Sequence, residues 1–178
     1  AKVQVNQGPV GGRLNWSAAT VTDATHDPDG ILPAFTMTSA VEFAASGDVA
    51  LDAFGFVVGV GSFDLSKQSL TVNDDTIADF DADVLAVTVT VTDLFVGVGG
   101  SLSGGSIDKT GAIGLSASGT LSLAVVQDTT TPANQYIGLE ISSLNASLIG
   151  ITGLTFDVSG AKVQVNQGPV GGRLNWSA

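Results

Sequence analysis

Apolar and polar residues alternate along much of the chain, which is the pattern of β-strands with one apolar face. The clearest example is VLAVTVTVT at 84–92, where the odd positions are Leu or Val and the even positions are Ala or Thr. Similar alternation occurs at 2–7, 35–51, 63–72, 113–125 and 139–158. Abundant Val, Thr, Ser and 23 Gly favour strands and turns, and the residues that favour helices are scarce. The sequence therefore predicts an all-β protein.

The alternation changes phase at three places, Thr92-Asp93, Ser142-Ser143 and Ser159-Gly160. A one-residue shift moves every following side chain to the other face of a strand. An extra residue in one strand, a β-bulge, offsets such a shift. We therefore expect a bulge or a corner near Thr92-Asp93. Both faces are apolar at 53–60, which predicts extended chain with a bulge or bend there.

Short polar segments separate the predicted strands, at 73–83, 101–111 and 128–134. Such connectors favour an antiparallel meander of long bent strands, forming an elongated sandwich or a flattened barrel. The alternative is a β-solenoid in which each phase change is a corner. Within 13–17 we expect a short strand that carries Trp16, and the proline-containing segment 22–33 is expected to be an irregular loop.

The eighteen residues AKVQVNQGPVGGRLNWSA occur twice, at 1–18 and at 161–178. Identity at every position indicates a tandem repeat, with 1–160 as one full unit and 161–178 as the start of the next. Each copy is predicted to form a hairpin that joins neighbouring repeats. The two copies should have different surroundings, one internal and one presenting an unpaired edge to a neighbour. The residues predicted for this joint are Val3, Val5, Trp16, Val163, Val165 and Trp176.

Acidic residues outnumber basic ones by 17 to 6, which gives a formal net charge of −11. The second copy adds two basic residues and no acid, so one 160-residue repeat carries about −13. Nucleic acid is a poor partner for such a surface, because phosphate binding needs Lys and Arg. Mutual repulsion between acidic repeats would keep a long array dispersed.

The sequence offers little for catalysis. His26 is the only histidine, cysteine is absent, and no nucleophile elbow or phosphate-binding glycine motif is present. We therefore expect no enzymatic activity and no organic cofactor. The longest apolar stretch, 53–61, is too short for a membrane-spanning helix.

Calcium is the one ligand for which the sequence offers candidate residues. Closely spaced carboxylates beside a glycine turn can supply the oxygens that calcium needs. The alternative is that both groups are solvated acidic turns. The first candidate group is Asp23, Asp27 and Asp29, and the second is Asp74, Asp75, Asp79, Asp81 and Asp83.

The stretch from Ala86 to Gln167 resembles repeat units of giant secreted or surface proteins of bacteria, called adhesin-like. The resemblance rests on VTDLFVGVGGSL, AIGLSASGTLSLAVV and YIGLEISSLNASLIGITGLTFDVSGAKVQVN, in that order. It implies a repetitive β-protein without catalysis, at the cell surface or outside the cell. Several members carry an acidic, calcium-loop-like insert at the place of 103–109, where this chain has only Asp108 as an acid.

These observations lead to one main functional hypothesis and two alternatives. The main one is a structural repeat module of a long extracellular bacterial protein, acting as filament, spacer or adhesin stalk, whose partners are neighbouring repeats. The first alternative is a calcium-dependent module that binds glycan or a cell surface. The second is an apolar-ligand binder that encloses a lipid near Phe54 to Val60.

Overall fold

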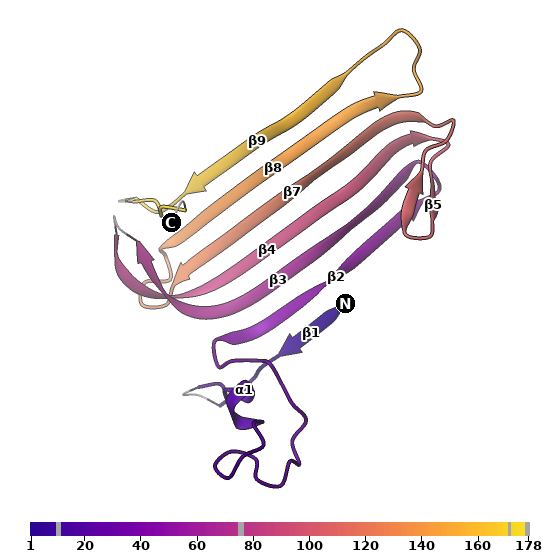
Figure 1. Ribbon diagram of the computed structural model, residues 1–178. Helices are drawn as coiled ribbons and strands as arrows, with labels where there is room; N and C mark the ends of the chain where they lie inside the picture. Colours follow the sequence, from indigo (N-terminus) through magenta and orange to yellow (C-terminus); the bar gives the residue numbers. More distant parts are fainter. Residues whose placement is uncertain (10–11, 75–76, 171, 177–178) are drawn as a thin grey trace.

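The computed structural model describes residues 1–9, 12–74, 77–170 and 172–176. Seven strands form one antiparallel sheet whose spatial order equals the sequence order (Figure 1). These strands are β1 (Lys2–Val5), β2 (Val41–Ala53), β3 (Val57–Asp74), β4 (Ile77–Val98), β7 (Ile113–Asp128), β8 (Gln135–Ile149) and β9 (Asp157–Gln167). β5 (Ser101–Ser103) and β6 (Ser106–Asp108) form a separate small hairpin, and α1 (Trp16–Ala19) is the one described helix.

The predicted all-β class and antiparallel meander are confirmed, with strands of up to 22 residues. The seven strands form a single open layer that does not close into a barrel. The register explains why the alternating pattern is so regular. Residues directly opposite each other in neighbouring strands project from the same face of a sheet. One such row of cross-strand partners crosses all seven strands and is apolar throughout: Val3, Ala45, Leu65, Val87, Leu123, Leu139 and Val165.

The next row along the strands projects from the opposite face. Its members are small or polar: Gln4, Ala44, Ser66, Ala86, Ala124, Gly138 and Asn166. We call the face of the first row the apolar face and the face of the second row the polar face. The sequence alternation therefore divides the sheet into two chemically different sides.

The phase changes in the sequence are β-bulges that preserve this division. The β4–β7 register shifts between Val91 and Leu94, as expected for a bulge at Thr92-Asp93. The β8–β9 register shifts between Ile141 and Leu144, and Ser143 at that place has a φ of 54°. Each extra residue returns the following aliphatic side chains to the apolar face. The prediction of a bulge is confirmed.

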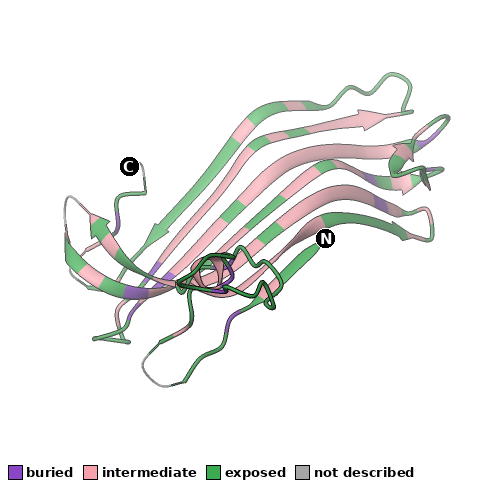
Figure 2. Ribbon diagram, turned by 60° about the horizontal axis from the view of Figure 1, so that its bottom comes forward, coloured by how far each residue is buried: buried purple, intermediate pink, exposed green. Residues whose placement is uncertain are grey.

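The two clusters of buried hydrophobic residues lie near the two ends of the sheet (Figure 2), and the register places their strand residues on the polar face. At one end, Val58 and Phe95 are fully buried beneath the β5–β6 hairpin, together with Ala112. At the other end, Leu174 of the second repeat copy packs on a cluster of Ala82, Val84, Val126 and Tyr136. Among the described residues, no member of the apolar rows is buried.

Three local expectations are corrected. The apolar segment near residue 54 is the tight β2–β3 turn, because Phe54 and Gly55 adopt φ values of 56° and 70° and the Asp52 carboxylate accepts the Gly55 N–H. Trp16 begins helix α1 instead of lying in a strand, because the Asn15 side chain caps that helix. The acidic segment 73–83 belongs mainly to β3 and β4, since its side chains pair across the two strands.

The turn at Phe54 generates a stability prediction. A non-glycine residue with positive φ is strained, and Phe54 offsets none of this by burial since it is 96% exposed. Phe54→Asn should raise the free energy of unfolding by about 0.5–1 kcal/mol, because Asn-Gly is the preferred pair for a turn with two positive φ values. Urea unfolding measures this, with Phe56→Asn in the same turn as a control that should give no increase. Destabilisation by Phe54→Asn would contradict the strain.

Candidate inter-repeat interface

The two copies of the repeated segment lie at opposite edges of the sheet, so the prediction that one copy is internal is wrong. β1, in the first copy, pairs with β2. β9 contains the strand of the second copy and pairs with β8. The first copy therefore contacts the strand that follows it in sequence, and the second copy contacts the strand that precedes it.

The described residues of the two copies share two internal hydrogen bonds. In the first, the Asn6 side chain donates to the Leu14 carbonyl at 2.9 Å and accepts from the Trp16 indole N–H at 3.0 Å. In the second, Asn166 makes the same two bonds, to the Leu174 carbonyl at 2.9 Å and from the Trp176 indole at 3.0 Å. The segment therefore folds locally into a strand, a loop and a tryptophan that is anchored to an asparagine, whatever surrounds it.

Glycine is required where this loop doubles back. A Cβ at Gly8 would lie 2.3 Å from the Gly12 carbonyl oxygen, and a Cβ at Gly168 would lie 2.2 Å from that of Gly172. Both distances are shorter than any real contact, so no other residue fits without moving the loop.

The first copy uses one hydrogen-bonding edge of its strand. In an antiparallel pair, successive residues direct their backbone N–H and C=O groups alternately toward one neighbour and toward the other. The Asn6 N–H donates to the carbonyl of Glu42 in β2, at 2.9 Å. Lys2 and Gln4, which have the same parity as Asn6, therefore face β2 as well, and the backbone groups of Val3 and Val5 face outward.

The second copy uses the other edge. The Asp128 N–H donates to the Asn134 carbonyl at 3.1 Å, so the even residues of β7 face β8. The register carries this parity across β8 to β9 without a shift between Ile137 and Ile141. Val163 and Val165 therefore face β8, and Lys162, Gln164 and Asn166 face outward. The Leu148 N–H bond to the Phe156 carbonyl, 3.1 Å, agrees with this assignment.

Equivalent side chains differ in burial between the two copies, and each copy buries one that the other exposes. Asn6 is fully buried in the first copy, where its amide also donates to the Thr38 carbonyl at 3.0 Å, whereas Asn166 is exposed. Leu14 is 51% exposed in the first copy, whereas Leu174 is 4% exposed in the second. The first copy thus buries the asparagine and the second copy buries the leucine, and neither copy buries both.

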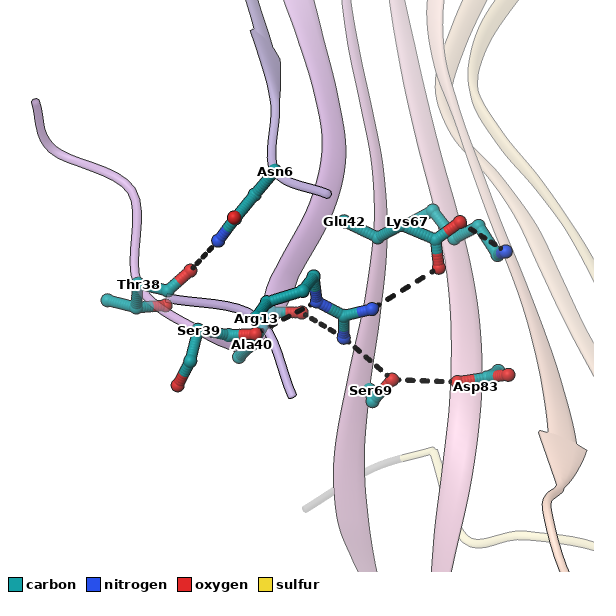
Figure 3. Close-up of polar contacts among 9 residues, drawn as sticks. All are labelled: Asn6, Arg13, Thr38, Ser39, Ala40, Glu42, Lys67, Ser69 and Asp83. Atoms are coloured by element: carbon teal, nitrogen blue, oxygen red, sulfur yellow. Dashed lines mark hydrogen bonds and ion pairs between the residues drawn. The ribbon is translucent and has the colours of Figure 1, made fainter. Parts of the chain in front are cut away.

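Arg13 belongs to the half that the first copy completes (Figure 3). Its guanidinium donates to the carbonyls of Ser39 and Ala40 at 3.0 and 3.3 Å and to the Ser69 hydroxyl at 3.0 Å. It also pairs with the Glu42 carboxylate at 3.7 Å. The equivalent Arg173 of the second copy is exposed.

The two tryptophans have different neighbours, as the sequence predicted for a joint. Trp16 packs edge-on against Phe35 with ring centroids 5.4 Å apart. Trp176 lies on Gly138 of β8, where a Cβ would come within 2.7 Å of the indole. A groove of about 770 Å³ along the polar face of β4, β7 and β8 begins beside Trp176.

Glu140 ties the second copy to β8 by charge. Its carboxylate accepts from the Lys162 ammonium at 2.9 Å and from the Gln164 amide at 2.7 Å. These two hydrogen bonds, that of Lys162 above all, lower the pKa of Glu140. In the first copy, Lys2 and Gln4 donate to the Thr36 hydroxyl instead.

The first group of candidate calcium ligands forms an ordinary loop. The Asp23 carboxylate accepts the Thr25 and His26 N–H groups and contacts the His26 ring, and these bonds lower its pKa. Asp27 is buried and accepts the N–H groups of Ile31 and Leu32 at 3.1 and 2.9 Å. Asp29 is exposed.

The second group is distributed along the β3–β4 hairpin. Asp79, Asp81 and Asp83 accept from Asn73, Thr71 and Ser69 across the strand pair, at 3.1, 2.7 and 2.8 Å. Asp74 accepts the N–H groups of Ile77 and of Asn175 in the second copy, and Asp75 lies outside the described residues. Within the described part of the chain, no group of three or more acidic or histidine residues has the arrangement of a metal site. Calcium binding stays a prediction.

Sequence reasoning found the apolar strand residues and tryptophans of the joint but missed three others. Asn6 organises the loop, Arg13 contacts residues 39–69 that follow the first copy in sequence, and Leu14 has an environment that differs from that of Leu174. Their occurrence in both copies was the only available signal. The bonds that give them these roles connect residues far apart in sequence, such as Arg13 and Ser69.

No family model, curated protein or solved structure matches this chain. The resemblance to adhesin-like repeats therefore stays a prediction. No helix in the described residues is long and apolar enough to cross a membrane.

Amide hydrogen exchange tests the opposite use of the two edges. The identical sequences of the copies make intrinsic exchange rates equal, so each copy is the control for the other. In the first copy, the Gln4 amide should exchange at least tenfold more slowly than the Val5 amide, because only Gln4 faces β2. In the second copy, the Val165 amide should be the slower one, and Gln164 the faster. The same order of rates in both copies would contradict the assignment.

The Glu140 contacts give a pH dependence. Because the folded-state pKa of Glu140 is lowered, its contribution to stability is present above the ordinary pKa of about 4.3 and is lost as the pH falls through the lowered value. Glu140→Gln should therefore lower the melting temperature at pH 7, and the difference from the unmodified chain should shrink below pH 4. A difference that is constant with pH would show that the charge of Glu140 is not responsible.

Proposed function

We propose that this chain is a structural repeat module of a long extracellular bacterial protein, in which one copy of the repeated segment serves two neighbouring repeats. The observation that carries the proposal is the use of opposite strand edges by identical sequences. In the second copy, the backbone groups of Val163 and Val165 bond to β8. Those of Lys162 and Gln164 face outward, and they are the equivalents of Lys2 and Gln4, which bond to β2 in the first copy. Both sets of hydrogen bonds fit on one strand.

The side chains also have enough donors for both sets of contacts. The asparagine amide has two hydrogens, which Asn6 uses for the Leu14 and Thr38 carbonyls. The lysine ammonium has three, so one side chain can bond to the equivalents of Glu140 and Thr36 together. A shared copy would bury the leucine against one repeat and use the arginine to bind the next.

The array built in this way is one continuous antiparallel sheet. Each repeat adds six strands: β2, β3, β4, β7, β8 and the shared strand. With strands about 4.8 Å apart, a repeat extends the sheet by about 29 Å across the strand direction. Such a sheet provides length and stiffness, which are the properties of a filament, a spacer or an adhesin stalk.

Edge protection and charge support this role. A free strand edge is a template for pairing with other chains, and a shared strand removes the edges between repeats. The polar face carries acids such as Asp48, Asp64 and Glu140, and the net charge of −11 disfavours non-specific association of the arrays.

A two-repeat protein, in which 1–160 is followed directly by 1–178, tests the shared strand. In its middle copy, the amides equivalent to Gln4 and Val5 should both exchange at least tenfold more slowly than the fast member of each pair in the single repeat, because both edges are bonded. Small-angle X-ray scattering should show the sheet longer by about 29 Å.

The matched control gives each repeat its own two copies. It consists of 1–178, a flexible Gly-Ser linker and a second 1–178. Here the strands that flank the linker should retain one fast-exchanging set of amides each. The proposal is wrong if the middle copy of the two-repeat protein also keeps one fast set, because its strand would then bond to one neighbour only.

A further inference from the structure

The apolar face is the largest part of the molecule that has no packing partner. One row of its apolar side chains crosses all seven strands, parallel rows cross the central strands, and none of the described members is buried. Beyond the row through Val87 it includes the row of Phe63, Val89, Leu121, Ile141 and Val163, and after the bulges the row of Val57, Val96, Leu115 and Leu148.

Charged residues are confined to one end of this face. Lys67 and Asp83 lie there, and Asp79 and Asp81 follow toward the β3–β4 turn. The polar face is covered at both ends, by the β5–β6 hairpin and by the loop of Leu174. Arg13 reaches Ser69 at the charged end of the apolar face, and the aliphatic rows beyond that end have no covering segment among the described residues. A sheet with one apolar face is stable in water when a second layer covers that face.

The size of the face sets the scale of the missing layer. Seven strands at about 4.8 Å span about 34 Å, and some twelve residues at about 3.4 Å span about 40 Å. The face therefore measures about 1,300 Å², and an interface between two such faces would bury about 2,600 Å². Stable protein complexes typically bury about 1,200–2,000 Å² in total, so this face is large enough for a permanent interface.

The chemistry of the face fits a second copy of itself. Its middle rows contain Val, Leu, Ile, Ala and Phe without a charged residue, so two of them can pack together without desolvating a charge. Two sheets packed face to face lie about 10 Å apart and interdigitate such side chains. In this arrangement the acidic polar faces point away from each other. A lipid surface fits less well, because its anionic headgroups would repel a chain of net charge −11.

We propose that two copies of this chain associate through their apolar faces and form a two-layered sandwich. The proposal goes beyond the shared strand and does not depend on it, since it concerns the face of the sheet instead of its edges. The two are compatible. The apolar row includes Val3 and Val165, so a continuous array would carry an unbroken apolar face from one repeat to the next.

Analytical ultracentrifugation of the single repeat gives the first test. The chain should sediment as a dimer with twice the monomer mass of 17.8 kDa. Leu123→Lys places a charge at the centre of the apolar face and should raise the dissociation constant at least a hundredfold. Ser122→Lys is the matched control, because it adds the same charge one residue away on the polar face and should leave the dimer intact. A monomeric unmodified chain, or a dimer that withstands Leu123→Lys, would overturn the proposal.

A labelling experiment covers the case in which Leu123→Lys fails to fold. The chain has no cysteine, so Val87→Cys and Thr88→Cys each introduce a single thiol, on the apolar and the polar face. A bulky maleimide should react at least tenfold more slowly with the first than with the second in the native state, and equally fast in urea. Equal native rates would overturn the proposal. Co-flotation of the chain with zwitterionic lipid vesicles, accompanied by loss of the dimer, would do the same and assign the face to lipid.

Discussion

One constraint governs the structure: a wide aliphatic sheet face favours burial, but the chain folds into a single layer that leaves this face uncovered among the described residues. The β-bulges at Asp93 and Ser143 keep the aliphatic side chains on this one face. Without a bulge, every side chain beyond it would move to the other face of the strand. The β5–β6 hairpin and the loop of Leu174 pack on the polar face, in two small clusters that contain Phe95 and Tyr136 respectively. The chain thus stabilises the ends of its sheet internally, and its largest apolar surface is directed outward.

The edges of the sheet, like its apolar face, have no partner among the described residues. β1 and β9 are open edges formed by the same sequence, and each exposes the backbone groups that the other uses. Exposed edges and exposed apolar faces are unfavourable for an isolated protein. In an assembly they are the two directions in which a sheet grows, by adding strands in its plane and by adding a second layer. These open edges and this uncovered face are the observations that support the proposed repeat array and the proposed two-layered association.

Much of this fold could be predicted from local pattern. The alternation through Val87 identified β4, its phase change identified the bulge at Asp93, and the DTTTPAN segment identified the β7–β8 turn. The errors share a cause. The helix at Trp16 and the turn at Phe54 are each stabilised by a backbone N–H that donates to a side-chain oxygen, of Asn15 and of Asp52. Such local hydrogen bonds compete with strand formation and leave no periodic signal in the sequence. The roles of Asn6 and Arg13 depend on partners more than thirty residues or more than fifty residues away.

The sequence by itself determined the strands, their two-sided chemistry and the exact duplication of 1–18 at 161–178, because period-2 alternation and duplication are local properties of the chain. Three features were decided only by the tertiary structure. These are the edge through which each copy bonds, the complementary burial of Leu14 and Leu174, and the absence of a covering layer over the apolar face among the described residues. Each depends on the register of every strand pair across the sheet. Identical sequences acquired different environments because register and neighbours, and not residue identity, decide which groups of a strand remain free.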